Sequence, residues 1–185
     1  MNSYGPEGAN DYSPGCQPGV RMINRINSEG VTEETMASTL TNLLVHVVFS
    51  TKGREPSITD KYQARLHAYI GGIIRNEGAK LLSIGSMPDH VHLAIKIRSN
   101  QPLSELVRKI KANSSKWINE NQFCRNKFFW QNGYGGFSVS ASQINKVRSY
   151  IENQAEHHKS KTFKEELIEI LDKHGVDYDP KYLWN

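Results

Sequence analysis

Hydrophobic residues along the chain follow two periods, one typical of strands and one typical of helices. In residues 90–97 the odd-numbered positions are all apolar and alternate with polar or small residues, as in a strand with one buried face. In residues 60–77 apolar side chains recur every three or four positions, as on one face of a helix. These patterns predict strands in residues 43–50, 79–87 and 90–97, and a strand broken by a glycine-rich bend in residues 128–140. They predict helices in residues 60–77, 102–120, 143–158 and 162–175.

The order of these elements predicts the fold class. The second and third strands are joined by a very short link, which favours antiparallel pairing. A strand, helix, strand, strand, helix, strand order fits an α+β fold with a ferredoxin-like antiparallel sheet and helices on one face. We therefore expect the other face of the sheet to be an exposed floor.

The composition divides the chain into three parts. Residues 1–40 are rich in glycine and proline and show neither period, so we expect a flexible N-terminal tail without regular structure. Residues 41–160 form the predicted domain, and residues 161–185 form a C-terminal helical extension.

Charge and cysteine content limit the class of protein. The 185-residue chain has a formal net charge of +4 and a pI of about 9.0, which permits a nucleic-acid partner. Its two cysteines do not suggest a disulfide framework. The longest apolar run is far shorter than the ~20 residues of a membrane span. These features predict a soluble cytoplasmic protein with no membrane partner.

Two histidines lie on the polar side of the strand at residues 90–97. The side chains of His90 and His92 share one face, with Cβ atoms about 7 Å apart, so both rings can bind one divalent ion. A third, oxygen-bearing ligand would complete a site for Mg²⁺ or Mn²⁺. Asp89 is adjacent, but the alternation turns it to the other face. The alternative is a pair of solvated surface histidines.

Further candidates lie on the helix at residues 143–158 and on the first strand. Tyr150 and Gln154 are one turn apart on the apolar stripe of the helix, where Tyr150 is either a core-edge aromatic or a functional residue. His46 either shares the sheet face of the histidine pair or is an ordinary satisfied histidine. His157 and His158 are expected to be solvated residues at the helix end.

A basic segment is the candidate DNA surface. Residues 98–127 hold seven basic residues and two acids, and the alternative is an ordinary solvated helix face. Residues 152–179 are acidic and are expected to stay away from DNA or to shield the site. The candidate DNA-binding residues are Lys52, Arg54, Arg108, Lys109, Lys111 and Lys116.

Several of these motifs together resemble a known family. The stretch MPDHVHLAI, followed by a helix bearing SYIENQ, resembles the single-tyrosine HUH transposases of small bacterial insertion sequences, the IS two-hundred type. The stretches LLVHVVFSTKGREP, LVRKIKANSSKWINEN and FWQNGYGGFSVS also match that family's pattern. The resemblance covers roughly residues 41–158.

The resemblance implies a mechanism and the residues that carry it. Tyr150 would attack single-stranded DNA and form a 5′-phosphotyrosine link. His90, His92 and Gln154 would hold Mg²⁺ or Mn²⁺, with no small-molecule cofactor. The family acts as a homodimer on DNA with hairpin ends. The alternatives are a domesticated or non-catalytic hairpin-binding protein on the same fold, and a metal-dependent hydrolase that uses water.

Overall fold

The computed structural model describes residues 23–26, 32–35, 40–181 and 183, and divides the chain into two units, residues 1–40 and 41–185. In the first unit, β1 (Ile23–Ile26) pairs antiparallel with β2 (Thr32–Thr35). These eight residues thus form strands that the sequence pattern did not indicate. The flexibility predicted for this tail stays a prediction, since most of it lies outside the described residues.

The second unit is built on an antiparallel sheet with strand order β4-β5-β3-β6 in its described part. This order, with one helix between β3 and β4 and another between β5 and β6, is the ferredoxin-like arrangement predicted from the sequence. The last strand is shorter than predicted, because regular pairing begins at Gly135 and Trp130 makes only an isolated bridge with Thr51. The strands are β3 (Leu43–Ser50), β4 (Lys80–Met87), β5 (His90–Ile97) and β6 (Gly135–Val139).

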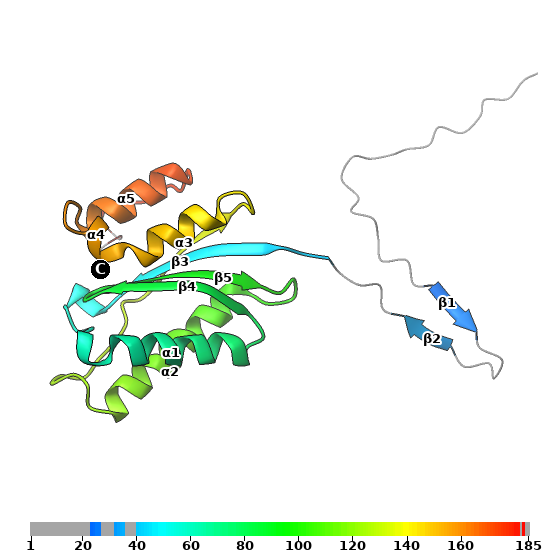
Figure 1. Ribbon diagram of the computed structural model, residues 1–185, viewed down its shortest axis with the longest axis horizontal. Coiled ribbons are helices and arrows are strands. Elements are labelled where there is room, and N and C mark those ends of the chain that lie inside the picture. The colour runs from blue at the N-terminus through cyan, green and yellow to red at the C-terminus, as the bar shows by residue number, and fades with distance from the viewer. Residues whose placement is uncertain (1–22, 27–31, 36–39, 182, 184–185) are drawn as a thin grey trace, which may run out of the picture. The chain divides into compact units, whose positions relative to one another are not determined.

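Helices lie on both faces of the sheet (Figure 1). The α+β class is confirmed, and α1 (Asp60–Asn76) and α2 (Leu103–Glu120) cover one face as expected. The placement of helices on one face only is wrong, because α3 (Ile144–Glu152) packs on β4 and β5 from the other side. That face also carries α4 (Gln154–His157) and α5 (Phe163–Lys173). The helix expected over residues 143–158 is thus interrupted at Asn153, where φ is −103° and ψ is 26°.

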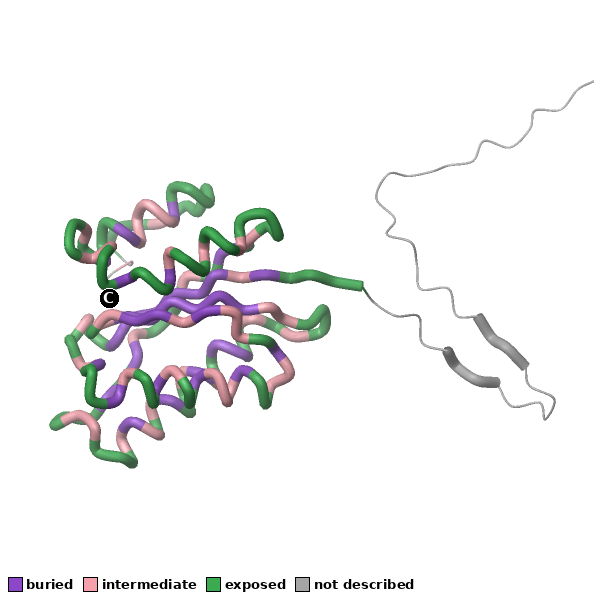
Figure 2. Tube along the Cα trace, viewed as in Figure 1, coloured by how far each residue is buried: buried purple, intermediate pink, exposed green. Residues whose placement is uncertain are grey.

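The main core lies between the sheet and helices α1 and α2, and the buried strands are visible in Figure 2. It is built from the apolar side of each strand, since Val47, Leu93 and Ile95 are 0% exposed. Their partners on the helices include Leu66 and Ile110, which are equally buried. Burying such side chains supplies the main driving force for folding this half of the unit.

A smaller apolar cluster attaches α5 to the opposite face. Phe163 and Leu171 of α5 pack with Val48 of β3 and Phe137 of β6. A capping box at Thr162 fixes the beginning of the helix. The helix is therefore held over the sheet by its own apolar stripe.

Gly85 in β4 allows α3 to lie unusually close to the sheet. A Cβ atom at this position would lie 2.0 Å from the backbone carbonyl oxygen of Ile151. Only glycine fits there without displacing the helix. This contact sets the height of α3, and with it the position of Tyr150, above the strands.

Candidate active site

The histidine pair lies under helices, where the sequence pattern predicted an exposed floor. His90 is 1% exposed and His92 is 0% exposed. Helices α3, α4 and α5 cover this face (Figure 1), and the ring of His90 stacks on Phe163 of α5 at 4.2 Å between centroids. The expectation of an exposed floor is wrong because the C-terminal helices bring an apolar stripe of their own.

Each histidine of the pair has one ring nitrogen engaged and one without a hydrogen bond. Nδ1 of His90 lies 2.6 Å from a carboxylate oxygen of Asp89, and Nδ1 of His92 lies 3.0 Å from Nε2 of His46. Nε2 of both histidines is buried and lacks a hydrogen-bond partner. Asp89 thus contacts His90 although the alternation turned it away, and His46 shares the face of the pair. Such contacts orient an imidazole and leave its other nitrogen free to bind a metal.

A carboxylate from α5 completes this group. Glu166 is 1% exposed, and its Oε2 lies 3.6 Å from Nε2 of His90 and 3.3 Å from Nε2 of His92. The ligand atoms of the three residues all lie within 4.8 Å of one another. His158, expected to be solvated, has a side chain that is only 7% exposed, with its Nε2 3.2 Å from the same Oε2. His157 is partly buried, with its Nε2 3.8 Å from Oε1 of Glu166.

Sequence reasoning missed Glu166, although the chain carries a signal for it. On α5, Phe163, Leu167, Ile170 and Leu171 form an apolar stripe, and Glu166 occupies a position within that stripe. An acid at a buried helical position needs a partner that offsets the loss of hydration. An acid within an apolar stripe therefore indicates a polar site beneath the helix.

Tyr150 and Gln154 meet the histidines at this same carboxylate. The Tyr150 hydroxyl donates a hydrogen bond to Oε1 of Glu166, and Nε2 of Gln154 lies 3.2 Å from that oxygen. Gln154 is 2% exposed, and its Oε1 has no hydrogen-bond partner. Tyr150 is half-buried, and its ring centroid lies 5.9 Å from that of His92. The structure thus brings together all four residues proposed for the chemistry, around a fifth that was not proposed.

Burial controls the charges in this cluster. It lowers the pKa of His46 to about 3, helped by the nearby His92, and it also lowers the pKa of His92. Burial also raises the pKa of the Tyr150 hydroxyl, and the negative Glu166 raises it further. Burial alone would raise the pKa of Glu166, but its contacts with His92 and Tyr150 outweigh this and lower it. At neutral pH the phenol is therefore protonated and the carboxylate is ionised.

The residues present fit a divalent metal ion. Two buried imidazole nitrogens without hydrogen bonds face a buried carboxylate at close range, and imidazole and carboxylate are ligands that Mn²⁺ accepts. The outer nitrogens of both rings are already oriented by Asp89 and His46. The arrangement places side chains with the chemistry of a metal site beside a phenolic hydroxyl.

The sequence was compared with models of known protein families. A family model described as "Transposase IS200 like" matches residues 39–154. The chain belongs to this family. The match ends before α5, so it covers the histidine pair, Tyr150 and Gln154 but leaves Glu166 outside. The resemblance drawn from the sequence motifs is confirmed.

Two sequence relatives of this chain support the family assignment, and two solved structures share its fold. Transposases for insertion sequence element IS200 from Salmonella typhimurium and Salmonella typhi are each 26% identical over 133 residues, covering 69% of this chain and 86% of theirs. The crystal structure of a candidate transposase from Deinococcus radiodurans R1 matches with a TM-score of 0.52 and 22% identity, over 66% of this chain and 98% of its own. A REP-associated tyrosine transposase bound to a REP hairpin matches with a TM-score of 0.51 and 16% identity, over 68% of this chain and 74% of its own.

The lysines and arginines predicted to bind DNA from α2 of this transposase make local contacts. Arg108 pairs with Glu105 at 2.8 Å, and Lys109 pairs with Glu77 at 2.7 Å. Lys116 lies 3.7 Å from a carboxylate oxygen of Glu120, and both side chains are exposed. These pairs are surface ion pairs, which exchange readily with solvent and with other charges.

Lys111 has a structural role. Its ammonium group donates to the backbone carbonyl oxygens of Gln131 and Gly133, at 2.5 and 2.6 Å. Burial lowers the pKa of this amine. Lys111 therefore holds the loop before β6 in place.

The remaining two predicted DNA contacts, Lys52 and Arg54, lie in a short 3-10 helix, η1 (Lys52–Arg54), that directly follows β3. The backbone amide of Thr51 donates to the carbonyl oxygen of Asp89 at 2.8 Å. This bond ties the beginning of η1 to the end of β5 that carries His90. Lys52 and Arg54 thus lie at the same end of the sheet as the histidine pair.

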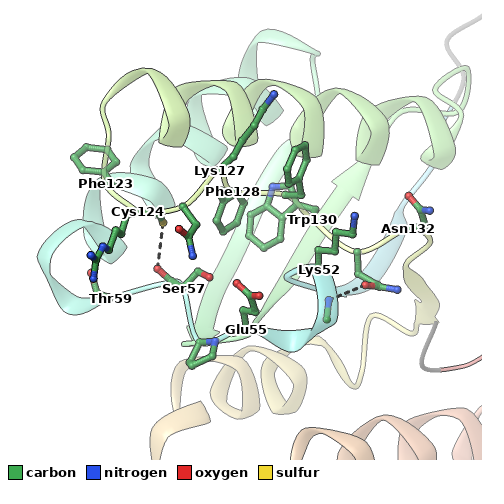
Figure 3. A pocket seen from close by; sticks show the side chains of 16 residues that line it. Lys52, Glu55, Ser57, Thr59, Phe123, Cys124, Lys127, Phe128, Trp130 and Asn132 are labelled. Atoms are coloured by element: carbon green, nitrogen blue, oxygen red, sulfur yellow. Dashed lines mark hydrogen bonds between the residues drawn. The ribbon is translucent and has the colours of Figure 1, made fainter.

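A groove next to η1 combines basic and aromatic side chains (Figure 3). It has a volume of about 900 Å³ and runs between residues 52–59 and 123–132. Lys52, Arg125 and Lys127 line it, and the exposed ring of Phe129 has Lys52 Nζ at 5.6 Å and Lys127 Nζ at 5.3 Å from its centroid. Such a combination suits the phosphates and bases of single-stranded nucleic acid.

Proposed function

We propose that this protein is a metal-dependent transposase that nicks and rejoins single-stranded DNA through a 5′-phosphotyrosine intermediate. One observation carries the proposal: the Tyr150 hydroxyl and the free nitrogens of His90 and His92 converge on the two oxygens of one buried carboxylate. A nucleophile and a metal-binding pair then lie within one small site, on a chain of the IS200-like transposase family.

In the proposed reaction Tyr150 acts as the nucleophile. Its oxygen bonds to the phosphorus of a phosphodiester as the bond from phosphorus to the 3′ oxygen breaks, and Tyr150 loses its proton while the leaving oxygen gains one. The phosphotyrosine bond conserves the energy of the cut strand, so a 3′ hydroxyl can later displace Tyr150 and rejoin the DNA without ATP.

His90, His92 and Gln154 are the proposed metal ligands, with Mg²⁺ or Mn²⁺ as the ion. When bound, the ion polarises the scissile phosphate and offsets its developing negative charge. Asp89 and His46 hold the two imidazoles so that each Nε2 faces inward. The free Oε1 of Gln154 is the buried amide oxygen available to the ion.

DNA with hairpin ends is the proposed partner, bound by a homodimer of this chain. The relative of similar fold that was solved with a REP hairpin supports such a substrate. Lys52 and Arg54 lie at the site's end of the sheet, and we propose that the adjoining groove carries a single-stranded segment over Phe129. The exposed Arg108 and Lys116 and the partly buried Lys109 of α2 are proposed as further contacts to the DNA backbone.

The scissile phosphate needs a way into the buried site. A hollow of about 440 Å³ borders Asp89 and His158, both of which contact His90, and Lys159 and Lys161 also line it. We propose that the phosphodiester approaches through this hollow, where Lys159 and Lys161 pair with Glu156 and Glu169 and can exchange these partners for a phosphate.

The test is covalent capture of DNA. The full-length protein is incubated with a single-stranded hairpin oligonucleotide and Mn²⁺, and the adduct is followed on denaturing gels and mapped by mass spectrometry. We expect an adduct at Tyr150 in the natural protein, none in Tyr150→Phe, and an unchanged adduct in Tyr69→Phe. Tyr69 is a matched control because it lies on α1 and stacks on Trp117.

Two other results would each contradict the proposal in a distinct way. Hairpin binding without any adduct would indicate the non-catalytic DNA-binding alternative. Cleavage that survives Tyr150→Phe would indicate a metal-dependent hydrolase in which water attacks the phosphate.

A further inference from the structure

The C-terminal helix α5 enters the site from a part of the chain that the family match does not cover. The match ends at residue 154, whereas Glu166 is near the beginning of α5. Glu166 nevertheless makes more polar contacts in the site than any residue proposed for the chemistry: its Oε1 contacts Tyr150 and Gln154, and its Oε2 lies near His90, His92 and His158.

The packing of α5 fixes the position of this carboxylate. Phe163, one turn before Glu166, stacks on His90, and Leu171 packs into the cluster with Val48 and Phe137. The capping box at Thr162 sets where the helix begins. A side chain held on a packed helix is positioned more precisely than one on a loop.

The carboxylate of Glu166 also faces two imidazole nitrogens with which it makes no hydrogen bond. A buried carboxylate is costly unless hydrogen bonds and an opposite charge offset the loss of hydration. On its Oε2 side, Nε2 of His158 lies at hydrogen-bond distance, 3.2 Å, whereas Nε2 of His90 and Nε2 of His92 approach to 3.6 and 3.3 Å without a hydrogen bond. Three potential ligand atoms thus face one another without a hydrogen bond joining them, as expected around a cation.

The charge of the proposed ligand set also favours Glu166. Two neutral imidazoles and one carboxamide bring no negative charge to a divalent ion. Mg²⁺ and Mn²⁺ favour carboxylate oxygens, which add charge as well as coordination. Glu166 supplies the carboxylate that the set of His90, His92 and Gln154 lacks.

We propose that Glu166 is an anionic ligand of the divalent ion held by His90 and His92, which makes α5 part of the active site. This role rests on the proposed function. The second oxygen of the carboxylate accepts the hydrogen bond of the Tyr150 hydroxyl, so one side chain links the nucleophile to the metal-binding pair. Gln154, whose Nε2 donates to the same oxygen, helps to orient it.

The test measures metal binding, not activity. Mn²⁺ affinity of the full-length protein is determined by electron paramagnetic resonance of the free ion, for the natural protein, Glu166→Gln, His92→Ala and Asp172→Asn. Asp172 is a matched control because it is an exposed acid on the same helix. We expect Glu166→Gln to weaken binding at least tenfold, His92→Ala to abolish it, and Asp172→Asn to leave it unchanged.

The outcomes separate the two proposals. If His92→Ala loses the ion while Glu166→Gln binds it like the natural protein, the role of Glu166 is wrong and the proposed function stands. If neither change affects Mn²⁺ binding, the metal site itself is wrong. Circular dichroism in the presence of a chelator checks the fold of each variant, and glutamine has nearly the size of glutamate without its buried charge.

Discussion

The two faces of the sheet differ in what they bury: one buries apolar side chains and the other buries polar ones. On the face covered by α1 and α2, β5 contributes Leu93 and Ile95 to an apolar core. On the other face it contributes His90 and His92, which are as deeply buried as the core residues. Burial on the first face needs only complementary shape, whereas burial on the second requires a partner for each polar atom.

This difference explains why the second face depends on the end of the chain. The apolar core is closed by the helices that connect the strands. The polar face receives Tyr150 and Gln154 from α3 and α4 and Glu166 from α5, which follow the last strand. We infer that changes on the first face act mainly on stability, and changes on the second act mainly on metal binding and catalysis.

The largest loss of stability is expected for a substitution in the core of the apolar face. Leu93→Ala removes a fully buried side chain from the core and should lower the free energy of unfolding by about 2–5 kcal/mol. The measurement is urea denaturation, with Mn²⁺ affinity of the folded protein determined in parallel. A variant as stable as the natural protein, or one that loses Mn²⁺ affinity while folded, would contradict the inference that the apolar face acts mainly on stability.

Gly85→Ala should affect the contact between the sheet and α3. The added Cβ atom would meet the carbonyl oxygen of Ile151 at 2.0 Å, so the helix must shift. We expect a loss of about 1–3 kcal/mol in stability, typical of overpacking, together with weaker adduct formation by Tyr150.

A glycine on the other side of the sheet is the control for Gly85→Ala. Gly72 lies in α1, where an added Cβ would meet nothing within 4 Å. Gly72→Ala should raise stability by about 0.5–1 kcal/mol, because alanine favours the helix. Equal effects of the two changes in urea denaturation would contradict the close approach of α3.

On the polar face, Asp89→Asn should weaken metal binding and leave stability nearly unchanged. The Asp89 carboxylate orients His90 through Nδ1, and loss of such a contact weakens metal binding by about 10–100-fold. Titration calorimetry with Mn²⁺ measures this effect, and urea denaturation in a chelator should show little change. A large loss of stability without a change in Mn²⁺ affinity would assign Asp89 to the fold alone.

Two substitutions on α2 distinguish a lysine with a structural role from a lysine proposed to bind DNA. Lys111→Met removes two hydrogen bonds to backbone carbonyl oxygens and should lower stability by about 1–2 kcal/mol. Lys116→Met, at an exposed position, should leave stability unchanged and reduce the salt dependence of DNA binding. Stability is measured by urea denaturation and DNA binding by titration at several salt concentrations. If Lys111→Met changed DNA binding and left stability unchanged, Lys111 would be a DNA contact and not a structural residue.

The fold was largely predictable because its signals are local. Alternation in residues 90–97 and helical spacing in α1 and α2 each reflect one buried side, and the short link between β4 and β5 sets their pairing. The helices on the second face were misplaced because the histidines made that face look polar and hence exposed. A polar side chain in a strand does not show whether solvent or a distant helix will cover it.

The site was predictable only where residues share one element or a family motif. His90 and His92 are two residues apart, and Tyr150 and Gln154 are four apart, so their proximity follows from geometry. Glu166 and His46 reach the same point through tertiary packing, across 76 and 44 residues from His90 respectively. The acid in the stripe of α5 was visible, but its partner could not be identified from spacing.

Anomalous diffraction from crystals of the full-length protein soaked in Mn²⁺ tests most directly whether the polar face is a metal site beside a nucleophile. We predict one strong peak within bonding distance of Nε2 of His90, Nε2 of His92 and a carboxylate oxygen of Glu166. The absence of a peak there, with those side chains ordered and Mn²⁺ bound elsewhere, would contradict the account.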